Sequence, residues 1–133
     1  MNKKILITAT LLGLISIILG AFASHGLKNT ISEDSLRSFE VGVKYQMYHA
    51  IFLFFISQFS FLKLKTKKLI LILTVLGTIL FSMSIYLLTT SGLTGLNFKP
   101  FGFLTPIGGL LLIFAWGLLL FSILKEKNIL FEK

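Results

Sequence analysis

The sequence predicts an all-α integral membrane protein, a four-helix bundle that forms a single domain over residues 1–133. Hydrophobic residues make up 55% of the chain and charged residues only 14%, whereas soluble domains carry about 25% charged residues. The mean hydropathy is +0.91. Lysines gather at the ends of the apolar runs. A bilayer accommodates this composition because the outward faces of its helices must be apolar.

The first span is expected over residues 5–23, behind a basic head of sequence MNKK. A run of this length crosses a hydrocarbon core of about 30 Å. The alternative is a signal peptide, because Ala21-Phe22-Ala23 resembles an A-x-A cleavage site. We favour a retained helix, since the run is long for a signal and the following residues read as part of the folded unit.

Residues 24–44 connect the first two spans and predict a short amphipathic helix on the extracytoplasmic surface. Thr30 and Glu33 have the spacing of a capping box, and Ser32 is a competing cap. Apolar residues recur at helical spacing at Leu36, Phe39 and Val43. Glu40 and Lys44 have the i,i+4 spacing of an ion pair. The alternative is that this helix runs straight into the second span, with a bend at Gly42.

The remaining spans are expected over residues 45–62, 69–91 and 106–124. Thr105 is the expected N-cap of the last one, with Pro106 as its first residue. Gly108, Gly109 and Gly117 would let another helix approach closely, and an oligomer of this chain is one use of such glycines.

The distribution of basic residues predicts that both termini are cytoplasmic in a bacterial plasma membrane. With the N-terminus inside, nine lysines lie inside and four basic residues outside, which is a clear positive-inside bias. The net charge of +8 is therefore read as membrane orientation. We expect no nucleic-acid binding, because there is no soluble basic domain to carry it.

Four short motifs, taken together, resemble a known family. They are Gly20-Ala21-Phe22-Ala23-Ser24-His25-Gly26-Leu27, Val43-Lys44-Tyr45-Gln46-Met47-Tyr48-His49-Ala50, Phe81-Ser82-Met83-Ser84-Ile85-Tyr86, and Thr105-Pro106-Ile107-Gly108-Gly109 followed by Ala115-Trp116. In order and spacing they resemble the bacterial membrane proteins grouped as domain of unknown function 423, which include YgdD- and YwdK-like proteins. The resemblance covers roughly residues 5–124 and implies a four-span fold without an established activity. Ser24, Met83 and Ala115 stand where the family usually has glycine, which puts close packing at those points in doubt.

Both histidines of the chain and three of its five acidic residues lie within residues 20–50. His25 ends the first span and His49 begins the second, so a shared site near the outer surface is geometrically feasible. Ionisable residues at membrane depth are functional hypotheses by default. The free N–H groups at the start of the last span would point to the same side and suit an anion or lipid head group. The candidate ligand-binding residues are His25, Glu40, Lys44, Tyr45, Gln46, Tyr48, His49, Thr105, Gly108 and Gly109.

A structural role is the alternative for each of these residues: hydrogen bonding between helices for the histidines, and capping and packing for Thr105 and the glycines. We expect no catalytic residues, because no serine near a histidine has an orienting acid at a diagnostic spacing. We expect no metal and no cofactor, since two histidines without a positioned carboxylate make a poor zinc site and nothing indicates haem. The absence of cysteine excludes disulfides, thiolate ligands and a lipoprotein anchor.

The sequence thus favours a non-enzymatic membrane protein that binds a lipid, a small ligand or a protein partner through an outward-facing His/Tyr/Glu cluster. Membrane lipids and a second copy of the chain are the expected partners. The alternative is a small-solute or ion transporter or channel. Because four spans are few for a complete pathway, that alternative requires an oligomer.

Overall fold

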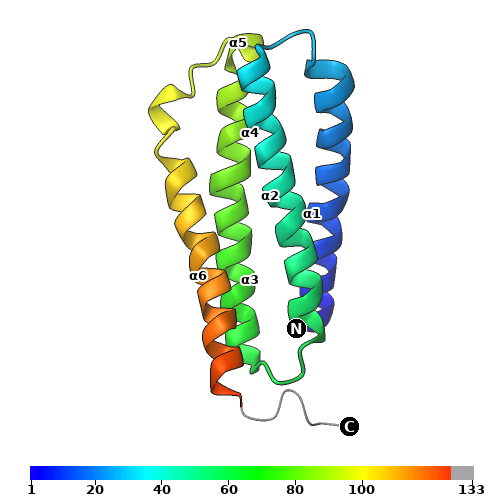
Figure 1. Ribbon diagram of the computed structural model, residues 1–133, viewed down its shortest axis with the longest axis vertical. Helices are drawn as coiled ribbons and strands as arrows, with labels where there is room; N and C mark the ends of the chain where they lie inside the picture. The colour runs from blue at the N-terminus through cyan, green and yellow to red at the C-terminus, as the bar shows by residue number, and fades with distance from the viewer. Residues whose placement is uncertain (127–133) are drawn as a thin grey trace.

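The computed structural model describes residues 1–126, and these residues form helices and loops with no strand among them (Figure 1). The elements in chain order are α1 (Asn2–Phe22), the π-helical turn η1 (Ala23–Leu27), α2 (Glu33–Gln58), α3 (Leu64–Thr78), the π-helical turn η2 (Ile79–Met83), α4 (Ser84–Thr89), α5 (Ser91–Thr94), the 3-10 turn η3 (Lys99–Phe101) and α6 (Leu104–Lys125). The prediction of an all-α protein is confirmed.

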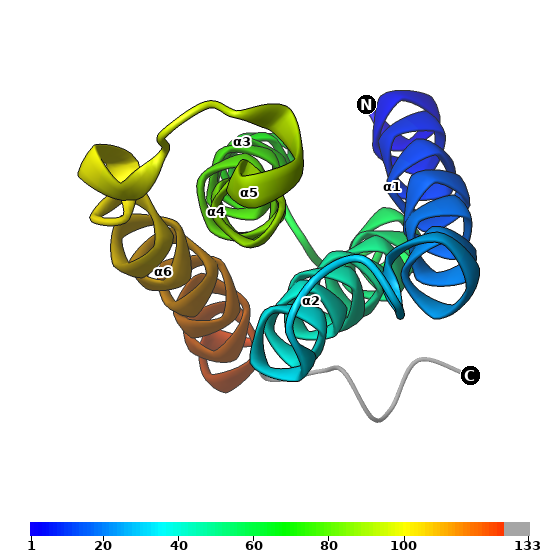
Figure 2. The same ribbon diagram turned by 90° about the horizontal axis from the view of Figure 1, so that it is seen from above.

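Four long rods lie side by side: α1, α2, the continuous helix from α3 through η2 to α4, and α6 (Figures 1 and 2). Successive rods run in opposite directions, so Met1, the loop from α2 to α3 and the last turn of α6 share one end of the bundle (Figure 1). We call this the basic end, after the lysines it carries: Lys3, Lys4, Lys63, Lys65, Lys67, Lys68 and Lys125. Lys127 and Lys133, also expected on this side, lie outside the described residues.

Three helices are long and apolar enough to cross a membrane: Asn2–Leu27, Leu64–Thr89 and Lys99–Lys125. The fourth rod, α2, has 26 residues and a length of about 39 Å, so length does not exclude it. Its first three turns carry charged residues, and Gln46 and His49 follow in its apolar half. The structure therefore shows four packed helices, three of which have the composition of membrane spans.

The prediction of a separate amphipathic helix between the first two spans is wrong. Residues 33–58 form one helix, which Ser32 caps by accepting a hydrogen bond from the backbone N–H of Ser35 at 3.2 Å. Gly42 does not interrupt it. Instead, a Cβ atom there would lie 2.8 Å from the ring of Tyr86, so the glycine admits a neighbouring helix. The helix continues because its buried face continues, from Phe39 through Gln46, Leu53 and Ile56.

Most of the core lies toward the basic end of the bundle, where α1, α2, α3 and α6 meet. Its buried apolar residues are Ile5, Ala9, Phe52, Leu53, Ile56, Leu62, Ile70, Ala115 and Leu119. A second cluster of Ala23, Leu27 and Phe39 closes the opposite end. Lys67 is also buried at the basic end, where its Nζ donates hydrogen bonds to Asn2 Oδ1 and to the Ser57 carbonyl, both at 3.1 Å. This lysine ties α1 and α2 to α3.

Gly108 allows α6 to pack directly on the backbone around η2. A Cβ atom on Gly108 would lie 2.3 Å from the backbone nitrogen of Phe81 and 2.8 Å from the carbonyl oxygen of Gly77. A Cβ atom on Gly77 would lie 2.7 Å from the Leu112 side chain. These two glycines therefore serve packing within one chain, and an interface with a second copy cannot use the same faces.

The start of α6 differs from the prediction by two residues. The helix begins at Leu104 with Phe103 at the N-cap, so Thr105 is not the cap and Pro106 is the third helical residue. The hydroxyl of Thr105 instead lies 2.7 Å from the Ser84 hydroxyl on α4. Proline is still tolerated there, because the first-turn N–H groups have no partner within the helix.

The three positions at which the family that the sequence resembles usually has glycine differ from one another in burial. Ser24 and Met83 each lie in one of the two π-helical turns, and both side chains are exposed. Only Ala115 is fully buried, in the core beside Leu119. The doubt about close packing therefore applies to neither Ser24 nor Met83, which point away from neighbouring helices.

Candidate functional site

His49 lies half-way along the bundle and joins α2 to α6. Its side chain is only 4% exposed. Trp116 Nε1 donates a hydrogen bond to His49 Nε2 at 3.2 Å, and His49 Nδ1 lies 2.7 Å from the Tyr45 carbonyl oxygen. An indole nitrogen can only donate, so Nε2 must be the acceptor and Nδ1 must carry the proton. Both ring nitrogens of a neutral imidazole are thus used within the protein.

Gln46 occupies the adjacent turn of α2 and faces away from α6. Its Nε2 donates to the Leu12 carbonyl on α1 at 2.9 Å, and its Oε1 accepts from the Tyr86 hydroxyl on α4 at 2.9 Å. The amide is 4% exposed. Two further hydroxyls, of Ser16 and Ser82, donate to the carbonyls of Val43 and Gly42 on α2. The polar groups of α2 between Gly42 and Gln46 therefore serve mainly as hydrogen-bond partners of neighbouring helices.

The structure separates the two histidines, so they do not form the shared site that their sequence positions made geometrically feasible. Gln46 bonds to Leu12, and Gly13 faces Ala50, which places His49 level with the middle of α1. His25 lies about 12 residues further along, in η1, which corresponds to about 18 Å of helix. Its side chain is exposed at the end of the bundle away from the basic end.

The other predicted site residues divide into two groups. Tyr45 and Tyr48 lie beside His49 on the outward face of α2, 43% and 54% exposed. Lys44 and Glu40 lie about one and two turns before Tyr48, Lys44 exposed and Glu40 half-buried. The expected ion pair between these two does not form. Within residues 1–126, the salt bridge on this helix joins Arg37 to Glu33 at 2.7 Å.

Thr105, Gly108 and Gly109 do not join the histidines either. Trp116, which bonds to His49, lies eight residues after Gly108, or about 12 Å along α6. Gly108 is buried against the backbone of η2. A Cβ atom placed on Gly109 would lie 3.7 Å from the Phe81 ring, an ordinary van der Waals contact. The geometry at the start of α6 favours the packing role for both glycines over an anion site.

An open groove of about 560 Å³ runs between α2 and α6, with the His49–Trp116 hydrogen bond beneath it. Its lining residues are Tyr45, Tyr48, His49, Ile51, Phe52, Phe55, Phe59, Trp116 and Leu119. The Phe52 ring stacks on Trp116 with a centroid distance of 4.3 Å. The groove is thus walled almost entirely by aromatic and aliphatic side chains.

Sequence reasoning found three of these residues and missed the other six. The aromatic residues at positions 48, 52, 55 and 59 recur at helical spacing, which indicates one face of a helix, but membrane helices carry such residues toward lipid as well. Trp116 was the stronger signal, because it is the only tryptophan in the chain. Its pairing with α2 depends on tertiary packing and could not be seen in the sequence.

Residues 19–109 match the family model described as a protein of unknown function, DUF423. The chain belongs to the DUF423 family. Similar proteins include the UPF0382 membrane protein YwdK of Bacillus subtilis, 32% identical over 92% of this chain and 98% of that one, and a UPF0382 membrane protein of Haemophilus influenzae, 30% identical over 97% and 100%. The UPF0382 inner membrane protein YgdD of Escherichia coli is 29% identical over 96% of this chain and 94% of its own length. No solved structure matches the chain.

Family membership and the three apolar helices together identify a membrane protein. The matched region of the DUF423 model contains η1, all of α2 and the continuous rod from α3 to α4. It ends within the first turns of α6, so it includes His49 but stops before Trp116.

Proposed function

We propose that this DUF423 protein is a non-enzymatic, four-span protein of the bacterial plasma membrane that binds a single lipid-like chain in the groove between α2 and α6. The observation that carries the proposal is the groove itself. It is open at the surface, has a volume of about 560 Å³ and is lined by apolar and aromatic side chains over a hydrogen-bonded His49–Trp116 pair. An apolar ligand needs such a wall, with few polar groups to leave unsatisfied.

The dimensions of the groove favour an elongated ligand. Its lining extends along α2 from Tyr45 to Phe59, which is about 21 Å of helix in a hydrocarbon core of about 30 Å. A chain lying in it would run parallel to the acyl chains of the bilayer and enter from the side. Phe59 lies at the end of the groove nearer the basic end, and Tyr45 and Tyr48 lie at the other end, nearer the middle of the bundle. The two tyrosine hydroxyls are the polar groups that such a molecule would meet there.

The membrane arrangement is part of the same proposal. In the apolar half of α2, the polar residues Gln46 and His49 are buried and hydrogen-bonded to other helices, so they present little polarity to lipid. Hydrogen bonds of Asn2, Leu12 and Ser16 join α1 to the other helices, which supports α1 as a retained span. The excess of lysine at the basic end supports cytoplasmic termini.

A binding role is favoured over catalysis by the state of His49. Both of its ring nitrogens are engaged, one with Tyr45 and one with Trp116. A general base needs a free nitrogen within reach of the proton that it removes. The imidazole therefore acts as a structural link beneath the ligand groove.

Fluorescence of Trp116 tests the proposal, because this single tryptophan lines the groove. The protein is placed in nanodiscs containing increasing fractions of phosphatidylcholine brominated on its acyl chains, which quenches nearby tryptophan. Occupancy of a site gives quenching that saturates at a low fraction of brominated lipid. Quenching that only follows the bulk fraction overturns the proposal, and so does a stable dimer whose partner chain shields the groove.

Two matched variants sharpen this test. Ile51→Phe adds volume inside the groove at a side chain that is 47% exposed, whereas Ile113→Phe makes the same change on α6 outside the lining, at 65% exposure. The saturable quenching is expected to weaken in Ile51→Phe and to persist in Ile113→Phe. Equal behaviour of the two variants contradicts binding in the groove.

A further inference from the structure

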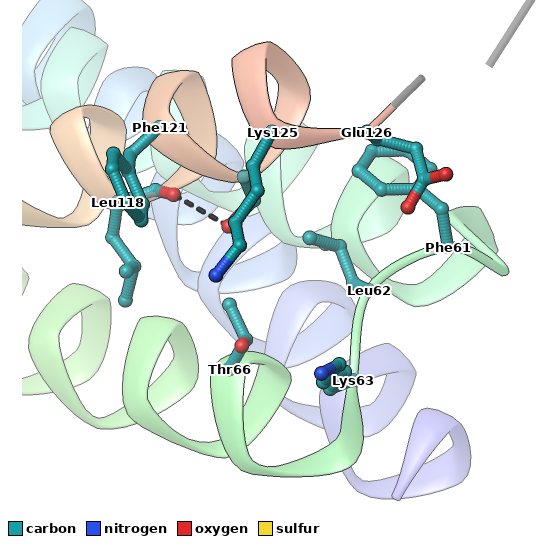
Figure 3. Close-up of a pocket in the computed structure, with 9 residues that line it drawn as sticks. Phe61, Leu62, Lys63, Thr66, Leu118, Phe121, Lys125 and Glu126 are labelled. Atoms are coloured by element: carbon teal, nitrogen blue, oxygen red, sulfur yellow. Dashed lines mark hydrogen bonds between the residues drawn. The ribbon is translucent and has the colours of Figure 1, made fainter. Parts of the chain in front are cut away.

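A second pocket, of about 290 Å³, opens at the basic end of the bundle and is separate from the groove. It lies between the α2–α3 loop, the first turn of α3 and the last turns of α6 (Figure 3). The residues that line it are Phe61, Leu62, Lys63, Thr66, Leu118, Phe121, Ser122, Lys125 and Glu126. None of them lines the groove between α2 and α6.

The pocket combines positive charge with hydroxyl groups. The side chain of Lys125 extends from α6 toward Thr66 on α3 (Figure 3). Lys63, the N-cap residue of α3, also lines the pocket. Among residues 1–126, neither ammonium group pairs with a carboxylate. Glu126 is the acidic residue of the lining, so two cations face one anion.

The walls of the pocket are apolar. Leu118 and Phe121 come from α6, while Phe61 and Leu62 come from the loop. Phe121 is 61% exposed, so the apolar wall continues on to the outer surface of α6. A ligand that fills this pocket thus meets two cations and apolar side chains together.

We propose that this pocket binds the phosphate-containing head group of an anionic phospholipid. Lys63 and Lys125 pair with the phosphate, and the Thr66 hydroxyl donates to one of its oxygens. Phe121 and Leu118 contact the start of an acyl chain. The Ser122 hydroxyl is not available as a donor, because it already donates to the Leu118 carbonyl at 2.7 Å (Figure 3). Basic pockets between membrane helices are typical sites for anionic lipids. The volume lies at the lower limit of ligand pockets, about 300 Å³, which suits a head group and excludes a whole lipid.

A lipid is favoured over free phosphate because the apolar wall opens sideways. A free phosphate ion would pair with the lysines but make no contact with the apolar side chains of Phe121 and Leu118. The inference rests on the proposed membrane arrangement, but it is independent of occupancy of the α2–α6 groove.

Native mass spectrometry of the protein released from nanodiscs tests this assignment. The nanodiscs contain equal amounts of phosphatidylglycerol and phosphatidylcholine, and the measured quantity is the ratio of the two lipids retained. Wild-type protein is expected to retain phosphatidylglycerol preferentially. Each lysine near an anionic surface contributes about fivefold to such a preference, so Lys63→Gln/Lys125→Gln should lose about 25-fold.

Lys65→Gln/Lys68→Gln is the matched control, since it removes the same charge from exposed positions outside the lining. Its effect is expected to be smaller, because Lys65 and Lys68 do not line the pocket and so do not contact a head group bound in it. Glu126→Gln should raise the preference, because it removes the negative charge from the lining. If charge alone held the lipid, the two double variants would lose the preference for phosphatidylglycerol equally. That result would overturn the assignment of the lipid to this pocket.

Competition with inorganic phosphate distinguishes a phospholipid head group from free phosphate as the ligand of the pocket. Added to the nanodiscs at millimolar concentration, it should leave the retained phosphatidylglycerol unchanged. Displacement of the lipid by phosphate overturns the assignment to a lipid head group. Saturable quenching of Trp116 reports on the groove alone, so failure of the pocket and failure of the groove can be told apart.

Discussion

Trp116 donates its indole N–H to Nε2 of His49 across the gap between α6 and α2. The donor fixes the tautomer of the acceptor, because an indole nitrogen has no lone pair to offer. The second nitrogen of His49 is held by the carbonyl of Tyr45 on the preceding turn. The His49 imidazole is thereby held in one orientation by two hydrogen bonds. This part of the α2–α6 groove therefore has a fixed shape in the absence of a ligand.

The first prediction concerns the proton on this ring. In nanodiscs at neutral pH, nitrogen-15 NMR of labelled histidine should show His49 neutral, with the proton on Nδ1 and Nε2 unprotonated. Trp116→Phe removes the donor and should shift the Nε2 resonance of His49 while leaving His25, about 18 Å of helix away, unchanged. A proton on Nε2 in the wild-type protein would contradict the hydrogen bond from Trp116.

The second prediction concerns Gln46, whose amide links α2 to α1 and α4. Gln46→Met keeps the side-chain length but removes both hydrogen bonds, whereas Tyr86→Phe removes only the one between these two residues. Gln46→Met should therefore lower the free energy of unfolding more than Tyr86→Phe. Combining them in a double-mutant cycle should give a coupling energy of about 0.6 kcal/mol, and at most about 1.7 kcal/mol. Unfolding in mixed micelles measures it, and zero coupling would rule out the bond.

The third prediction concerns the contact between α6 and the backbone of η2. A methyl group at Gly108 would come within 2.3 Å of the Phe81 nitrogen, a backbone atom that cannot rotate away. Gly108→Ala should therefore destabilise the protein by about 1–3 kcal/mol. Gly117→Ala makes the same change on the same helix where nothing lies within 4 Å. Its thermal unfolding in detergent should match or exceed that of the wild type, and equal losses in both variants would contradict the packing role.

The sequence was sufficient for the helices and insufficient for their contacts. Apolar length and charge placement predicted four helical rods, with ends that agree to within five residues for the first, third and last. The second rod was misjudged, because the charged turns before Gly42 suggested a separate surface helix. In the structure, the buried face that starts at Phe39 runs on to Ile56 without a break, and this continuity outweighs the change in polarity.

The sequence predicted only part of the candidate site, and the reason is physical. Sequence position places His25 and His49 near the ends of successive spans, which made them appear close. It carries no information on depth within the bundle, and α2 begins 16 residues before His49. The residue that does contact His49, Trp116, lies 67 positions away, and only the packing of α6 beside α2 brings them together.

The last prediction tests whether α2 crosses the membrane. The natural chain has no cysteine, so each introduced cysteine is the only target for a membrane-impermeant maleimide. Asn29 lies exposed between η1 and α2, and Asn97 lies exposed between α5 and η3, both at the end opposite the basic end. Ser60 lies exposed in the α2–α3 loop at the basic end. Asn29→Cys and Asn97→Cys should be labelled on intact cells, and Ser60→Cys only after the membrane is permeabilised, because the basic end faces the cytoplasm. Labelling of Ser60→Cys together with Asn29→Cys from outside would mean that α2 does not cross. The fully inverted pattern would keep four spans and reverse their orientation, so the three positions separate the number of spans from their direction.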